Sequence, residues 1–85
     1  MLNIKILGPG CANCRNLEEL CREVIAENAL EAEIEKITDF REIMAAGIMS
    51  TPGLIINDRI VSSGKLPVKS TLTHWIMDAL AESDK

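Results

Sequence analysis

The fold is decided by the stretch Gly8-Pro9-Gly10-Cys11-Ala12-Asn13-Cys14, because it joins two patterns of different period. The run from Ile4 to Leu7 before it is short, apolar and typical of a strand. The pattern after it repeats apolar residues at helical spacing. Since the glycines and the proline end the strand, the sequence predicts both cysteines at a strand-to-helix corner.

The spacing of these two cysteines suits a reversible disulfide. Residues three apart on a helix share one face, with Cβ atoms about 5–6 Å apart, and a disulfide needs Cα atoms within roughly 4.4–6.8 Å. Cys11 and Cys14 can therefore bridge with little backbone movement. The start of a helix also favours the thiolate, which is the reactive form of cysteine. We expect Cys11 to be the exposed sulfur that ionises readily, and Cys14 to be the shielded resolving thiol.

Spacing alone leaves two other uses of this pair open, a structural disulfide and half of a metal site. The third cysteine, Cys21, lies about 10 Å along the helix from Cys14, which is too far for a bridge. It falls in the apolar stripe of the helix, so we expect a small core residue. An odd number of cysteines does not suit a secreted disulfide framework. In a reducing compartment a cysteine pair is more often catalytic or metal-binding than structural.

The composition describes a small globular protein. The chain has 85 residues, of which 47% are hydrophobic, and a net charge of −4. This predicts one domain over residues 1–85, near the lower limit for a useful core. The acidic residues are spread along the chain, which argues against nucleic acid or an anionic membrane as partner. No signal-peptide pattern opens the chain and no apolar run approaches the ~18 residues of a membrane span, so we expect a cytoplasmic protein.

Periodicity along the rest of the chain predicts the element order β-α-β-α-β-β-α. The first two strands, joined by a helix, are expected to be parallel with a right-handed crossover. Strand 31–37 alternates acidic and apolar residues, which predicts an edge strand, and residues 57–58 form the turn of a terminal hairpin. The order describes an α/β fold with a four-stranded mixed sheet packed by three helices. The expected strands are 3–7, 31–37, 54–56 and 60–62, and the expected helices are 12–28, a short one between 39 and 47, and one from about 72 to 82.

Several side chains are assigned from their place in these patterns. In the short second helix, Phe40, Ile43 and Met44 are expected to supply the apolar face. Trp75 falls on the apolar stripe of the last helix and is expected in the core, whereas His74 lies off that stripe, on the surface. The chain has no second histidine to complete a Cys/His zinc set.

Three motifs resemble those of thioredoxin-like proteins of the minimal, glutaredoxin-sized kind, and most of all the small prokaryotic redox-active disulfide proteins. They are Gly10-Cys11-Ala12-Asn13-Cys14, Thr51-Pro52-Gly53-Leu54 with the hairpin that follows, and Ser63-Gly64 ahead of the last helix. The resemblance covers essentially the whole chain. It implies a thioredoxin-like fold and the activity of a dithiol-disulfide oxidoreductase acting on protein disulfides.

The resemblance also implies roles for individual residues. Cys11 attacks the substrate disulfide, and Cys14 resolves the mixed disulfide that results. Thr51-Pro52 is a cis peptide bond that faces the two sulfurs, and the backbone of Thr51 pairs with a bound substrate strand. Thr51, Pro52 and Gly64 are thus the expected substrate-binding residues. On the residues alone, Pro52 would instead be read as a proline that begins a strand.

Cofactors and partners follow from the same resemblance. The chemistry needs no metal and no organic cofactor. The implied partners are protein disulfides and a thioredoxin-reductase-like electron donor, and we expect a monomer. Two departures leave the reduction potential and the use of glutathione open. Ala12-Asn13 stands where typical thioredoxins have Gly-Pro, and no aromatic residue precedes Cys11.

Two alternative functions use the same features. A soft-metal, copper-type binding or carrier domain also places Cys-x-x-Cys after a glycine-rich turn, and two thiolates suit Cu(I). Such domains run β-α-β-β-α-β and end on a strand, whereas this chain is predicted to end on a helix. The other alternative is a binding module that keeps the fold without turnover, and replacing Cys11 with Ser would distinguish it from an enzyme.

Overall fold

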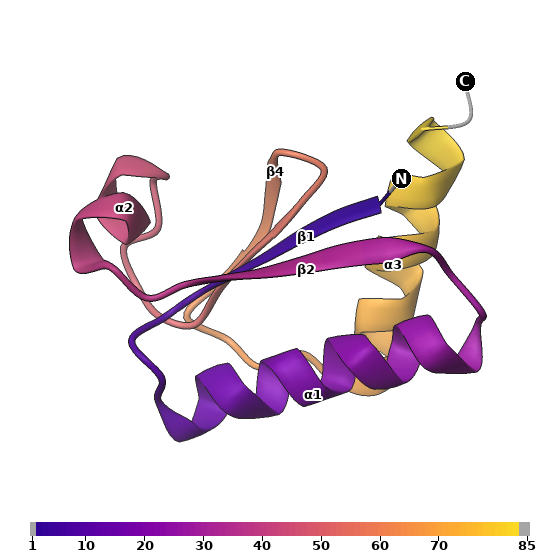
Figure 1. Cartoon of the computed structure of the whole chain (residues 1–85), viewed down its shortest axis with the longest axis horizontal. Coiled ribbons are helices and arrows are strands. Elements are labelled where there is room, and N and C mark those ends of the chain that lie inside the picture. The colour runs from indigo at the N-terminus through magenta and orange to yellow at the C-terminus, as the bar shows by residue number, and fades with distance from the viewer. Residues whose placement is uncertain (1, 84–85) are drawn as a thin grey trace.

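The structure, a computed structural model, describes residues 2–83 and has the element order that the sequence predicts (Figure 1). The elements are β1 (Leu2–Leu7), α1 (Ala12–Glu27), β2 (Ala32–Ile37), α2 (Phe40–Ala45), β3 (Gly53–Ile56), β4 (Arg59–Ser63) and α3 (Lys69–Ser83). Most bounds lie close to the expected ones, but α3 begins about one turn earlier. Across these described residues, no helix has the length and apolar character needed to cross a membrane.

The four strands form one mixed sheet in the order β2-β1-β3-β4. β1 runs parallel to β2 and antiparallel to β3, with Leu7 opposite Gly53. β2 lies at the edge of the sheet, as its alternating pattern predicted. Asn57 and Asp58 form the hairpin turn with φ of 49° and 66°, and tight two-residue turns of this kind need positive φ at both central positions.

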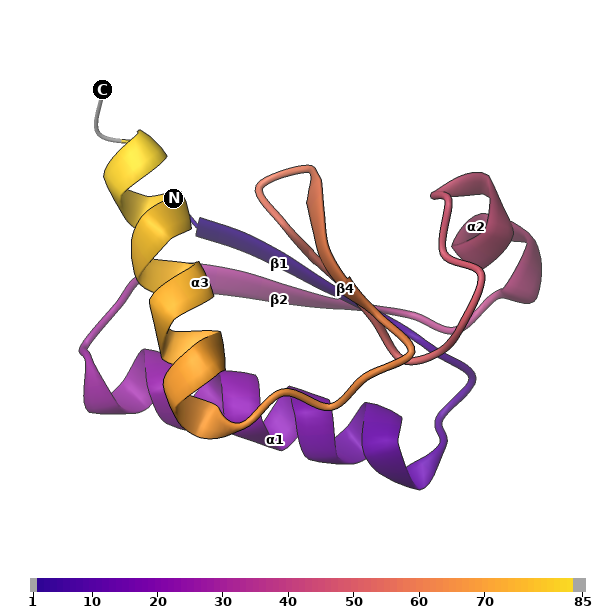
Figure 2. The same ribbon diagram turned by 180° about the vertical axis from the view of Figure 1, so that it is seen from behind.

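Two apolar clusters lie on the two faces of this sheet. α1 and α3 cover one face and enclose the larger cluster (Figure 1, Figure 2). Its buried residues are Leu2, Ile4, Ile6, Leu17, Cys21, Val24, Leu54, Ile56, Leu72 and Ile76. Because side chains alternate between the faces of a strand, Leu7 and Ile55 point to the other face, where they pack with Ile43 and Ile48. α2 therefore closes the second face only at the end of β1 that leads to the cysteines.

The ends of α2 are fixed by residue types that are common at helix ends. The Asp39 side chain accepts a hydrogen bond from the backbone N–H of Arg41 at 2.8 Å, which caps the helix. Gly47, with φ of +90°, follows its last turn, a conformation that favours glycine. The chain then continues through residues 48–52 into β3, so α2 sets the path of the Thr51-Pro52 segment.

Two predictions about buried side chains are wrong. Phe40 and Met44 are 66% and 61% exposed, and Ile43 is the buried residue of α2. The reason is length, because a six-residue helix has fewer than two turns and brings few positions against the sheet. Trp75 is half-buried and packs at the margin of the larger cluster, beside Val61 and on the wall of an open cavity. His74 is exposed, as expected.

Candidate active site

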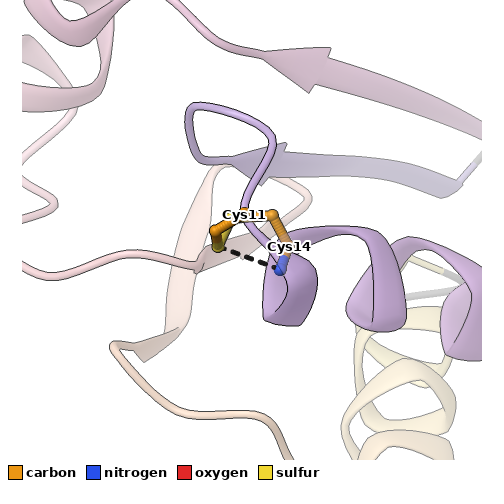
Figure 3. The surroundings of a disulfide bond; sticks show 2 residues. All are labelled: Cys11 and Cys14. Atoms are coloured by element: carbon orange, nitrogen blue, oxygen red, sulfur yellow. Dashed lines mark hydrogen bonds between the residues drawn. A yellow bond between two sulfur atoms is a disulfide. The ribbon is translucent and has the colours of Figure 1, made fainter.

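The two cysteines lie where the strand-to-helix corner was predicted. Cys11 is the N-cap of α1, with an extended backbone, and Cys14 lies in the first turn. Their Cα atoms are 5.0 Å apart and their sulfurs form a disulfide (Figure 3). The backbone N–H of Cys14 donates to Cys11 Sγ at 3.2 Å. After reduction, this N–H and the positive end of the helix favour a thiolate at Cys11.

The two cysteines differ in how far they are exposed to solvent. Cys11 is partly exposed, whereas Cys14 is only 5% exposed. The difference follows from the backbone, because Cys11 precedes the helix and Cys14 lies on the face that α1 turns toward the sheet. Cys11 is therefore the more accessible of the two cysteines.

Gly8 packs against the cysteine pair, a contact that the sequence did not predict. It was interpreted only as a strand breaker, but it is buried against the disulfide. A Cβ at this position would overlap Cys14 Sγ and would lie 3.2 Å from Cys14 Cβ and 3.8 Å from Thr51 Cβ. Only glycine lets the chain just after β1 pass this close to Cys14 Sγ. Nothing in the local sequence distinguishes this role from that of an ordinary breaker, since the contact depends on the fold.

The Thr51-Pro52 segment lies beside the same sulfur. The peptide bond between these residues is cis, as the resemblance implied, and the shared proximity to Gly8 places Thr51 next to Cys14. Gly64 is joined to this segment, because its backbone N–H donates to the Pro52 carbonyl oxygen at 2.9 Å. A Cβ at Gly64 would lie 2.7 Å from Ser50 Cβ. The structure thus brings together all five residues that the resemblance singled out.

A small cavity of about 130 Å³ opens beside Cys14. Its wall includes Glu18, one helical turn after Cys14, and Lys36 at the end of β2. The Glu18 carboxylate lies 3.2 Å from Lys36 Nζ and 2.9 Å from a guanidinium nitrogen of Arg22. The hydrogen bonds from Arg22 and then Lys36 outweigh desolvation and lower the pKa of Glu18. The cavity thus holds a carboxylate that is ionised at neutral pH and a cation close to the buried sulfur.

Glu18 corrects a sequence assignment. A charged residue of an amphipathic helix is expected on the solvated side, but the side chain of Glu18 is only 16% exposed. The spacing of four residues between Cys14 and Glu18 was the available signal, because positions four apart share a helix face. Lys36 could not have been found this way, since it reaches Glu18 only through the pairing of β2 with β1.

Cys21 takes no part in this site. It is fully buried in the larger apolar cluster, as predicted, and burial raises the pKa of its thiol to about 12. Within residues 2–83, no group of three or more His, Cys, Asp or Glu side chains is placed to hold a metal ion. Among the described residues, α2 lies ahead of Thr51 and α3 follows the hairpin, an order that differs from the β-α-β-β-α-β order of the soft-metal alternative.

A disulfide in the first turn of the helix after β1, beside a cis-proline loop, defines a thiol-disulfide oxidoreductase with a thioredoxin-like fold. Comparison with known proteins gives the family. The family model described as "Thioredoxin domain" matches residues 2–77, and the chain belongs to the thioredoxin family. The resemblance drawn from the motifs is therefore confirmed.

Two similar proteins, both named "Thioredoxin", support this membership. One, from Methanothermobacter thermautotrophicus, is 38% identical over 72 residues, which cover 85% of this chain and 94% of that protein. The other, from Methanocaldococcus jannaschii, is 40% identical over 67 residues, which cover 79% of this chain and 77% of that protein. The protein is accordingly a thiol-disulfide oxidoreductase of a size similar to these relatives.

The fold is also found in a solved structure. The crystal structure of the J-Trx1 fragment of ERdj5 superimposes with a TM-score of 0.64. The match covers 94% of this chain and 43% of that one, at 22% identity. This likeness supports the thioredoxin-like α/β fold, with its four-stranded mixed sheet and three helices.

Proposed function

We propose that the protein exchanges disulfides with protein substrates through its Cys-Ala-Asn-Cys site, with Cys11 as the nucleophile. The observation that carries this proposal is the difference between the two sulfurs. Cys11 is partly exposed and accepts the Cys14 N–H, while Cys14 is buried behind it. The accessible sulfur is thus also the one whose thiolate has a hydrogen-bond donor and a helix N-terminus beside it.

The reaction proceeds in two exchanges. The Cys11 thiolate attacks one sulfur of the substrate disulfide, that S–S bond breaks, and the other substrate sulfur leaves as a thiolate. A mixed disulfide now joins Cys11 to the substrate. The Cys14 thiolate then attacks Cys11 Sγ and displaces the second substrate thiolate. The substrate gains two electrons, and the Cys11–Cys14 pair is oxidised to the disulfide.

Thr51, Pro52 and Gly64 are proposed to bind the substrate beside this pair. Thr51 is partly exposed and lies next to Cys14, so its backbone is placed to pair with an extended substrate segment. Gly64 is exposed and hydrogen-bonded to the Pro52 carbonyl. Its lack of a side chain lets it pack closely against Ser50, which holds the Thr51-Pro52 segment in place.

Lys36 is proposed to assist the second exchange. Cys14 must lose its proton before it attacks, and burial disfavours its thiolate. Lys36 lines the cavity beside Cys14 and is held there by Glu18. A cation on the wall of the same cavity as the buried sulfur favours the ionised form, and Glu18 positions that cation.

The remaining parts of the proposal concern partners and setting. We propose that a thioredoxin-reductase-like flavoprotein supplies electrons to the oxidised pair, without a cofactor bound to this chain. The chain is proposed to act as a single domain, as a monomer and in the cytoplasm. Sedimentation equilibrium on the reduced protein tests the monomer, and a coupled NADPH assay with a thioredoxin reductase tests the electron donor.

The redox equilibrium of the cysteines tests the proposed chemistry. The protein is equilibrated in buffers of graded dithiol-to-disulfide ratio, alkylated, and read peptide by peptide in a mass spectrometer. We expect a cooperative two-electron transition of Cys11 and Cys14, with Cys21 unchanged. If the pair forms no disulfide, or co-purified metal protects it from alkylation, the proposal is wrong and the soft-metal alternative gains support.

A further inference from the structure

An open cavity of about 390 Å³ lies between α3 and the hairpin of β3 and β4. Ile56 and Val61 of the hairpin and Trp75 of α3 give it an apolar wall. α3 adds the small side chains of Ala79 and Ala81, which leave this space unfilled. Small-molecule sites in proteins have volumes of roughly 300–1,000 Å³. The cavity is therefore large enough for a small organic molecule.

This cavity lies at the other end of the sheet from the cysteine pair. Ile56 pairs with Ile4, whereas Gly53, at the start of β3, pairs with Leu7, which leads to the cysteines. Both ribbon views place the last turns of α3 and the hairpin turn away from the end where α1 begins (Figure 1, Figure 2). A ligand bound in the cavity does not meet the sulfurs, so an inference about it does not rest on the proposed function.

The charged side chains of the cavity leave it with an excess of negative charge. Asp78 and Glu82 lie three and seven residues after Trp75, so all three share one face of α3. Arg59, the one basic residue among the described residues that line the cavity, lies 3.0 Å from a Glu82 carboxylate oxygen. The Asp78 carboxylate lies 3.3 Å from the ring of His74, which carries charge only when protonated. With two carboxylates against one guanidinium, the wall has one negative charge in excess.

An aromatic ring beside carboxylates is a combination that binds organic cations. Trp75 is half-buried and lines the cavity, and a cation within about 6 Å of an indole ring is attracted by the quadrupole of the ring. We propose that the cavity binds a small organic amine in its protonated form. The hydrocarbon part of the ligand packs against Trp75 and Val61, and its ammonium group points to the two carboxylates. The net charge of −4 on the whole chain also favours a cation over an anion.

The chain has a single tryptophan, so its fluorescence reports directly on the wall of this cavity. The ligands to be titrated are n-hexylammonium, n-hexanol and hexanoate, which share six carbons and differ in charge. The variant is Asp78→Asn/Glu82→Gln. Its matched control is Glu33→Gln/Glu35→Gln, which removes the same number of exposed charges from β2, at the opposite edge of the sheet from the hairpin. Circular dichroism confirms that each variant is folded.

We expect n-hexylammonium to change the fluorescence saturably, with a dissociation constant on the order of 1 mM for a ligand of so few atoms. It should bind about five- to tenfold more tightly than n-hexanol, because the ring and the carboxylates both attract its charge. Hexanoate should bind more weakly than the alcohol. In Asp78→Asn/Glu82→Gln the preference for the amine should fall below about twofold, and in the control variant it should persist.

The inference is overturned if n-hexylammonium gives no saturable change, if n-hexanol binds as tightly, or if the double variant keeps the preference for the amine. A blocked tripeptide with arginine between two glycines is the fourth ligand. Tighter binding of this peptide than of n-hexylammonium also overturns the inference, because the occupant would then be a basic side chain of a partner protein. The redox equilibrium of Cys11 and Cys14 tests the proposed function separately from all these outcomes.

Discussion

Two regions of α1, its start and its middle, carry cysteines that differ in bonding and burial. Cys11 and Cys14 at the start of the helix form a disulfide, whereas Cys21, two turns further on, is a buried thiol whose pKa burial raises to about 12. The difference is one of position, because the first turn offers unpaired N–H groups and access to solvent. The apolar stripe of α1, where Cys21 lies, offers neither unpaired N–H groups nor access to solvent. The position on the helix, more than the cysteine itself, therefore decides which sulfur is suited to thiol-disulfide chemistry.

The largest expected effect is that of removing the sulfur at the start of the helix. Cys11→Ser should lower the rate of disulfide reduction by about 10³-fold or more, because a serine hydroxyl is not ionised near neutral pH. Cys21→Ala, on the same helix, should leave the rate within about twofold. Reduction of a chromogenic aryl disulfide by pre-reduced protein measures both rates. Comparable losses in the two variants would break the distinction between the two positions.

Gly8→Ala tests how closely the chain after β1 must approach Cys14 Sγ. The added Cβ overlaps Cys14 Sγ, so the substitution should destabilise the oxidised protein by about 1–3 kcal/mol. In a background in which both Cys11 and Cys14 are alanine, the same substitution should cost clearly less. Guanidinium unfolding of the four proteins measures the difference. An equal cost in both backgrounds would show that the sulfur is not what Gly8 accommodates.

The raised pKa of Cys21 predicts a pH dependence of stability. The thiol has an ordinary pKa of 9.0 in the unfolded chain and about 12 in the fold, so between these values the unfolded state has lost its proton and the folded state has not. The free energy of unfolding should therefore fall as pH rises above about 9, by up to about 1.4 kcal/mol per pH unit. Cys21→Ala should show a flatter decline over the same range. Parallel curves for the two proteins would mean that Cys21 is not buried as a thiol.

Lys36→Met should have the smallest effect. Loss of the cation beside Cys14 should slow the second exchange by about two- to threefold, because the lysine is partly solvated. Added salt should reduce the difference. Lys69→Met is the matched control. Lys69 pairs with Glu23 and Glu27, which lie on α1 as Glu18 does, but in later turns that are far from the disulfide. Stopped-flow release of the second thiol from a mixed aryl disulfide measures the step. If the two variants release the second thiol at the same rate, Lys36 takes no part in the mechanism.

The sequence predicted those features that depend on local patterns. Period two and period 3.6 gave the order of strands and helices, and the break at Gly8-Pro9-Gly10 placed Cys11 ahead of the first turn. The bounds of the short helix between 39 and 47 also follow from local residue types, a capping aspartate and a glycine with positive φ. The expected cis bond at Thr51-Pro52 came from the family resemblance, since statistics alone favour a trans bond.

The features that escaped prediction depend on contacts between distant segments. The close approach of Gly8 to Cys14 and the link from Gly64 to Pro52 exist only once the sheet has formed. Lys36 meets Glu18 because β2 lies beside β1. The exposure of Phe40 and Met44 could not be read from periodicity either, since a helix of six residues has too few turns to define a buried stripe.

The roles proposed for the two cysteines, attack by Cys11 and resolution by Cys14, can be tested directly. Cys14→Ser and Cys11→Ser variants are each reduced, mixed with a peptide disulfide, quenched with acid and mapped by mass spectrometry. Cys14→Ser is expected to accumulate one stable mixed disulfide at Cys11, while Cys11→Ser is expected to accumulate none because Cys14 is buried. If the Cys11→Ser variant forms a stable adduct at Cys14 as fast as Cys14→Ser forms one at Cys11, the proposed roles of the two cysteines are wrong.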